Sequence, residues 1–138
     1  MTDPDAIAYE VLTQASTTLD GLLDGRVDYA RTPADFTNQE ARLVFRPENG
    51  DGQLWGNPIQ DVDYLFECYG GDKETDSFEG AQAVHAALYD LWHGANAVTV
   101  ASGVLMQGRV LAKGLPVIHP DSGISYMVAR FSGKFRGL

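Results

Sequence analysis

The segment Asp61–Gly94, DVDYLFECYGGDKETDSFEGAQAVHAALYDLWHG, constrains the fold more than any other part of the chain. From Asp61 to Tyr69 apolar residues recur at every second position, which is the period of a half-buried β-strand. From Ala81 to Trp92 they recur at three- and four-residue spacings, which is the period of an amphipathic helix. The change of period across one polar turn predicts a strand followed by a helix that packs on the sheet.

Capping and burial both favour that helix. Asp76 is the predicted N-cap with Glu79 in the capping-box position, Ser77 is the competing cap, and Gly94 ends the helix. A cap contributes about 1 kcal/mol, whereas each buried Val or Leu contributes roughly 1.5–3 kcal/mol, so packing should dominate. The residues expected on the buried face are Ala81, Val84, Leu88, Leu91 and Trp92.

The rest of the chain predicts one more helix and further strands. Asp3-Pro4 opens an apolar-faced helix whose last apolar residue is Leu23 and which ends near Gly21 or Gly25. Strands are predicted at 26–29, at 41–46 with Pro47 ending it, and at 97–101, 104–113 and 125–135, the last two joined by a turn. The predicted order is α-β-β-β-α-β-β-β. We therefore expect a single α+β domain over residues 1–138, a mainly antiparallel sheet with two helices packed on one face.

Charge and cysteine content argue against several classes of protein. The chain has 19 acidic and 10 basic residues, a net charge of −9, which disfavours binding to a nucleic-acid backbone. Its one cysteine, Cys68, shares a strand face with apolar residues, so we expect a buried thiol and a reducing compartment. The start of the chain shows no signal-peptide pattern. No run approaches the roughly 18 apolar residues of a membrane span, so no membrane partner is expected.

No motif predicts catalysis, a metal site or a cofactor site. His85 and His93 lie two helical turns apart, about 12 Å of rise, and cannot share one ion, so with Tyr89 they predict a polar helix face. The acidic loop 72–76 resembles the start of a calcium loop but lacks the required Gly and Glu. There is no nucleophile elbow, Walker loop or GxGxxG. We expect a protein that is not an enzyme, although a triad assembled from distant residues stays open.

Charged and aromatic side chains outside the predicted buried faces suggest an interface. Basic residues share one face of two predicted strands, and acidic residues share one face of a third. If these strands are neighbours, the charges pair across the sheet; otherwise they pair between subunits and set the register of an oligomer. Exposed aromatic residues suit either kind of interface. The candidate oligomer or partner residues are Tyr29, Arg42, Arg46, Trp55, Asp61, Asp63, Tyr89, Arg130 and Lys134.

Several segments, taken in order, resemble the tail terminator proteins of long-tailed, non-contractile bacteriophages, which are also called tail-completion or head–tail joining proteins. They are the opening helix, GRVDYAR, ARLVFRP, DVDYLFECYGGD, AQAVHAALYDLW and the closing HPDSGISYMVARFSGKFR. The resemblance covers nearly the whole chain and rests on these features together rather than on one signature.

The resemblance implies a structural virion protein that forms a hexameric ring at the head-proximal end of the tail tube. Such a ring terminates tube growth and joins the tail to the head connector, and DNA passes through it without specific binding. The implied partners are further copies of the chain, the tail tube protein and the neck or connector proteins. The implied location is the neck region of the virion tail, after assembly in the host cytoplasm. The alternatives are a neck stopper or connector, a tail tube subunit, a small enzyme and a free ligand-binding domain.

Overall fold

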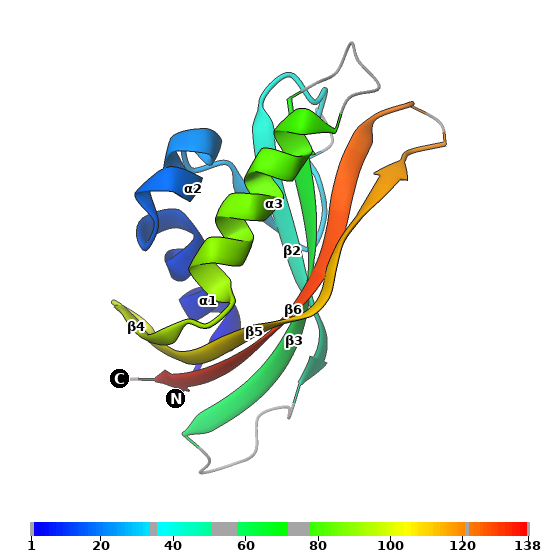
Figure 1. Ribbon diagram of the computed structural model, residues 1–138. Helices are drawn as coiled ribbons and strands as arrows, with labels where there is room; N and C mark the ends of the chain where they lie inside the picture. The colour runs from blue at the N-terminus through cyan, green and yellow to red at the C-terminus, as the bar shows by residue number, and fades with distance from the viewer. Residues whose placement is uncertain (1, 34–35, 51–57, 72–77, 121, 138) are drawn as a thin grey trace.

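The computed structural model describes residues 2–33, 36–50, 58–71, 78–120 and 122–137 (Figure 1). Its elements are α1 (Pro4–Gln14), α2 (Thr17–Leu23), β1 (Val27–Tyr29), β2 (Ala41–Gly50), β3 (Ile59–Gly70), α3 (Glu79–Trp92), β4 (Asn96–Val100), β5 (Gly103–Ile118) and β6 (Ser125–Gly137). The strands form one sheet in the order β1-β2-β3-β6-β5-β4. The sheet curls, and all three helices lie on one side of it (Figure 1).

The α+β class is confirmed, and the sheet type, helix number and order need correction. The sheet is mixed because β1 runs parallel to β2, while the other described pairs are antiparallel. The predicted N-terminal helix is two helices. It breaks at Ser16, which adopts an extended conformation and whose hydroxyl accepts a hydrogen bond from Leu19 N at 3.1 Å. Serine caps a helix readily in this way, and the observed order is α-α-β-β-β-α-β-β-β.

Two strands continue past residues that were predicted to end them. β2 runs through Pro47, and its register with β3 shifts between Pro47 and Asn49. β5 runs through Gly114 and Pro116, with register shifts between Leu105 and Gln107, Val110 and Ala112, and Ala112 and Leu115. A β-bulge lets a strand include a residue that cannot donate to the ladder. Pro47, Gly114 and Pro116, which the sequence suggested as ends of strands, therefore lie within strands whose pairing is irregular.

The core between the helices and the sheet centres on Trp92 of α3. Its ring centroid lies 6.2 Å from that of Tyr64, 5.5 Å from that of Phe66 and 6.1 Å from that of Phe135. Its indole Nε1 donates to the backbone oxygen of Ser132 at 2.9 Å, so the one polar atom of the ring is satisfied. These four aromatic side chains are fully buried. The C-terminal end of α3 is thus fixed against the two central strands.

The predicted buried face of α3 is confirmed. Ala81, Val84, Leu88 and Trp92 are buried and Leu91 is half-buried. The helix begins at Glu79, after an N-cap residue, Phe78, that makes no side-chain cap hydrogen bond. The predicted caps Asp76 and Ser77 lie outside the described residues.

Polar contacts hold α1 to the sheet. Asp3 is the N-cap of α1 as predicted, and its carboxylate accepts from Ala6 N at 3.2 Å. The carboxylate of Glu10 accepts from Ser102 N at 2.9 Å and from the Ser102 hydroxyl at 2.5 Å, which lowers the pKa of Glu10. These two hydrogen bonds link α1 to the turn between β4 and β5.

Two further expectations concern burial and membranes. Cys68 is fully buried as predicted, and burial raises the pKa of its thiol. Of the helices that the structure describes, none has the length and apolar character needed to span a membrane.

Truncation of one core residue of α3 should be costly. Leu88 is fully buried, so Leu88→Ala should lower the free energy of unfolding by about 2–5 kcal/mol. Gln82→Ala, at an exposed position of the same helix, should change it by less than about 0.5 kcal/mol. Urea denaturation of both variants measures the difference, and equal effects would mean that α3 does not pack on the sheet as described.

Candidate interaction surface

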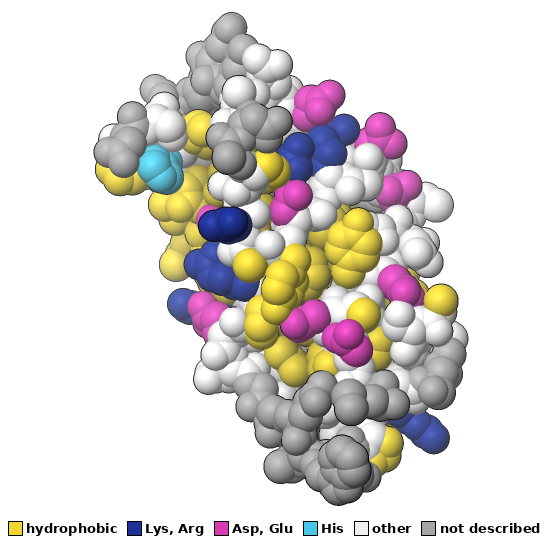
Figure 2. Space-filling model, turned by 180° about the vertical axis from the view of Figure 1, so that it is seen from behind, with side chains coloured by type: hydrophobic (Ala, Val, Ile, Leu, Met, Phe, Trp, Pro, Cys, Tyr) yellow, Lys and Arg dark blue, Asp and Glu magenta, His cyan; other side chains and the backbone are white. Residues whose placement is uncertain are grey.

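The face of the sheet opposite the helices, here called the outer face, carries six of the nine predicted interface residues. It does so because β2, β3 and β6 are neighbours in the sheet, which settles the strand order that the sequence left open. Figure 2 shows the molecule from behind, with apolar side chains in the middle of the view and acidic and basic side chains beside them. The six residues are Arg42 and Arg46 on β2, Asp61 and Asp63 on β3, and Arg130 and Lys134 on β6.

The three arginines among them form ion pairs within the chain. The pairs are Arg42 with Asp28 at 2.6 Å, Arg46 with Glu67 at 2.8 Å and Arg130 with Glu48 at 2.8 Å. All the partners are partly exposed, and pairs of this kind contribute about 0–1 kcal/mol each to stability. Arg46 with Glu67 is a cross-strand pair of the kind that the sequence suggested, whereas Arg42 and Arg130 pair with acids outside the predicted acidic row.

These pairs shield apolar residues that no helix covers. Leu65 of β3 has Arg46 and Arg130 as its register partners on the two sides, and it is only 6% exposed. Val44 lies between Asp28 and Glu67 in register and is fully buried. The aliphatic stems of arginine can cover apolar surface while the charged ends stay in water. The ion pairs thus close the β1–β2 side of the outer face.

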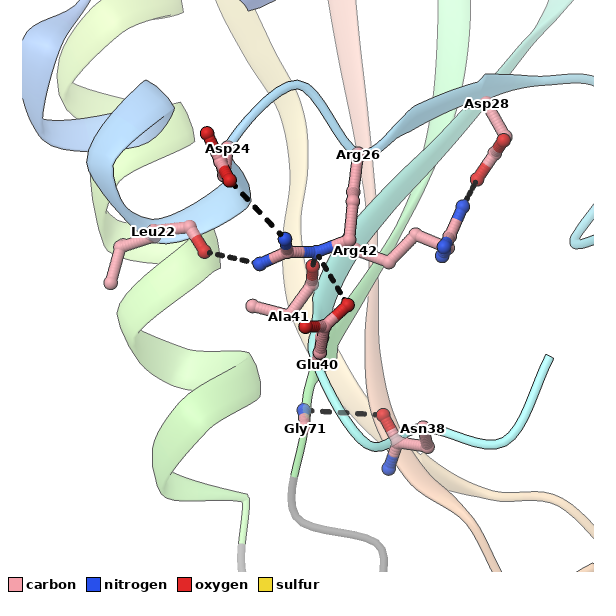
Figure 3. Close-up of polar contacts among 9 residues, drawn as sticks. All are labelled: Leu22, Asp24, Arg26, Asp28, Asn38, Glu40, Ala41, Arg42 and Gly71. Carbon is pink, nitrogen blue, oxygen red and sulfur yellow. Dashed lines mark hydrogen bonds and ion pairs between the residues drawn. The ribbon is translucent and has the colours of Figure 1, made fainter.

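Arg26 fixes the corner from which Asp28 reaches Arg42 (Figure 3). Its Nε donates to Ala41 O at 2.8 Å, and its Nη2 donates to Leu22 O at 3.3 Å. One guanidinium thereby joins the last turn of α2 to the first residue of β2. This contact holds β1 beside β2 in the parallel direction.

The other half of the outer face is an open groove of about 670 Å³. Acidic side chains of β3 and basic side chains of β5 and β6 line it together, and Asp61 is the register partner of Lys134. Mixed charge in an open groove suits a polar segment of another protein better than an apolar small molecule. Its lining includes Asp61, Asp63, Asn96, Gln107, Arg109 and Lys134.

The three aromatic candidates do not belong to this face. Tyr29 on β1 is 49% exposed and its hydroxyl donates to Asp5 at 2.7 Å, a hydrogen bond that raises the pKa of Tyr29 to about 12. Tyr89 on α3 stacks on His93 with the ring centroids 4.8 Å apart. Trp55 lies outside the described residues. The structure therefore gathers the charged candidates and separates the two described aromatic ones from them.

The polar side of α3 lies along β5. His85 Nε2 accepts from Gly114 N at 2.9 Å, and His93 Nδ1 accepts from Val110 N at 3.0 Å. Both bonds require a neutral imidazole whose other nitrogen carries the proton. The two histidines thus satisfy backbone donors along a bulged stretch of β5. The sequence showed the two histidines, but the bulges that turn these N–H groups toward α3 have no local sequence signal.

Among the residues that the structure describes, no three His, Cys, Asp or Glu side chains are arranged to hold a metal ion.

Comparison with known proteins gives a match at the level of the fold. A chain of the virion of a native gene transfer agent (GTA) particle has a TM-score of 0.62 and 20% sequence identity, and the match covers 94% of this chain and 91% of that chain. A second solved chain has a TM-score of 0.51 and 12% identity, over 100% of this chain and 97% of that chain. No protein-family model and no curated protein matches the sequence.

The bond between His85 and Gly114 should make stability depend on pH. Burial and the nearby charge of Lys113 lower the pKa of His85 below its ordinary value of 6.5. The unfolded chain then binds a proton at this site more readily than the folded chain, so stability is full above about pH 6.5 and declines as the pH falls toward the lowered pKa. Urea denaturation between pH 5 and 8 should show this decline in the wild type relative to His85→Gln, whose amide oxygen accepts the same bond without titrating. Lys113→Gln should weaken the dependence, and parallel profiles for wild type and His85→Gln would contradict the assignment.

Proposed function

We propose that this chain is a structural virion protein of a phage-like particle, and that it forms a ring at the head-proximal end of the tail tube. In this role it terminates tube growth and joins the tail to the head connector. Six copies in the ring, contacts with tube and neck proteins, and passage of DNA through the centre are parts of the same proposal. The protein then acts through the shape and charge of its surfaces, with no chemical turnover.

One observation carries the proposal: the fold matches a chain of the GTA virion over 94% of this chain and 91% of that one. A match that spans both chains means that the whole domain is shared rather than one motif. The order of elements that led to the tail terminator resemblance is also present, apart from the break at Ser16. These two likenesses agree on a virion role.

The position of β6 favours a terminator or neck role over a tube subunit. A tube subunit would be expected to carry the β5–β6 hairpin as a mobile arm for polymerisation. In this structure β6 pairs with β3 from Ile59–Arg136 to Tyr69–Tyr126, so the hairpin is part of the sheet. The two strands of the hairpin therefore belong to the sheet of the subunit and do not form a mobile arm.

Tube assembly is the experiment for this proposal. Tail tubes grown from the tube protein of the same particle should stop elongating when the purified chain is added, and negative-stain images should show a ring at one end. Lengths that keep increasing, with bare tube ends, would contradict the proposal. A neck stopper would bind the connector and leave tube growth unchanged, so adding isolated connectors to the assay separates the two roles.

The groove residues can be tested for a role in docking by a charge swap. Lys134→Glu places a second acid beside Asp61, its register partner, and should reduce both stability and tube capping. The double variant Asp61→Lys with Lys134→Glu restores opposite charges across the strands but reverses the pattern shown to a partner. We expect the double variant to recover wild-type urea stability and to cap tubes at least tenfold less efficiently. Recovery of both properties would mean that these charges serve the sheet alone.

A further inference from the structure

The segment Arg109–Ile118, here called the β5 edge, is a margin of the sheet along which no further described strand pairs. β4 pairs with β5 only between Gly103 and Gln107. Beyond that point β6 is the one described strand that pairs with β5. Three of the five exposed large hydrophobic side chains of the described residues lie here, namely Leu111 at 43%, Leu115 at 66% and Ile118 at 55%.

The β5 edge is closed to simple extension of the sheet. The N–H groups of Val110 and Gly114 are already bound by His93 and His85, and Pro116 has no N–H to offer. Such features prevent a further strand from pairing along an edge. Leu115 is opposite Val128 of β6 and Ile118 is opposite Ser125 three positions further on, so the apolar side chains face both sides of the ribbon. A partner would therefore contact side chains around this edge rather than add a strand.

The β5 edge is basic in a chain that is acidic overall. It carries Arg109 and Lys113 and no acid, and both are exposed. Neither forms an ion pair with the residues that the structure describes. Residues 103–138 have five basic and one acidic residue, a net +4, whereas residues 1–102 have five basic and eighteen acidic residues, a net −13. The acidic part of another copy of the same chain thus offers a surface of complementary charge.

The complementary surface is formed by α1 and α2. Residues 1–25 contain five acids and no Lys or Arg. Asp20 and Asp24 are exposed there, and Tyr9 of α1 is a further exposed large side chain at 43%. Figure 1 shows α2 and the upper part of β5 on opposite sides of the molecule. Two different, complementary patches on opposite sides generate head-to-tail contacts, which close into a ring when the rotation permits.

We propose that the β5 edge of one copy docks on the α1–α2 surface of the next copy, an assignment that rests on the ring of the proposed function. Arg109 and Lys113 approach the acids of α2, and Leu111, Leu115 and Ile118 are covered by the helices of the neighbour. This contact makes association depend on salt, because screening weakens attraction between exposed charges.

Two variants test the contact by making each copy incompatible with itself. The first, Arg109→Glu with Lys113→Glu, has two acidic patches. The second, Asp20→Lys with Asp24→Asn, has lost its acidic patch, and asparagine suits Asp24 because that residue has φ of 47°. All four positions are exposed. The second variant removes the ion pair of Asp24 with Arg26, which is long at 3.9 Å and has a 91% exposed carboxylate, so both variants should keep the wild-type circular dichroism and nearly the wild-type urea midpoint.

Self-association is measured by sedimentation velocity at high protein concentration and low salt, and by cross-linking in the presence of tail tubes. We expect each variant alone to associate at least tenfold more weakly than the wild type. An equimolar mixture should regain association, because alternating copies place an acidic β5 edge against a basic α2 and a basic β5 edge against an acidic one. Association of either variant like the wild type, or a mixture no better than its components, would overturn the docking assignment. A wild type that stays monomeric in both measurements would overturn it as well.

The outcomes also separate this assignment from the proposed function. If the wild type caps tubes while the variants self-associate normally, the ring exists but uses other contacts. If the mixture regains association while tubes continue to elongate in its presence and in that of the wild type, the docking contact stands and the terminator role fails.

Discussion

The close approach of α3 to β5 and β6 is the constraint from which the other features follow. Trp92 fits against the sheet because Gly108 and Gly133 lack side chains. A Cβ at Gly108 would lie 2.3 Å from the Trp92 carbonyl oxygen, and one at Gly133 would lie 3.1 Å from the indole ring. With this end of α3 fixed, His85 and His93 lie along β5 and hold its bulged backbone.

Ion pairs within the chain cover one part of the surface, and another part is open to a partner. Around Val44 and Leu65, ion pairs within the chain cover apolar side chains, so this half of the outer face is complete without a neighbour. The groove beside Asp61 and Lys134, and the β5 edge, remain open. Open, charged surfaces of this kind are suited to contacts with another protein.

The spacing of apolar and charged residues along the sequence predicted which side chains share a face of a helix or strand. The buried face of α3, the burial of Cys68 and the sharing of one face by Arg42 and Arg46 follow from spacings of 3.6 and 2 residues, and the structure has them. The parallel direction of β1 has no such signal, because it depends on contacts of Arg26 with α2 and β2 that join distant residues. Bulges in β5 likewise depend on pairing with β6. The two-residue period showed which charged side chains share a face of one strand. Which of these side chains form ion pairs depends on the strand order, which the sequence did not show.

A cryo-electron microscopy reconstruction of the particle that carries this chain would decide whether it is a virion ring protein. We expect density for six copies between the tail tube and the head connector, with DNA or an open channel on the axis. Location of the chain elsewhere in the particle, or its absence from purified particles, would contradict the proposal.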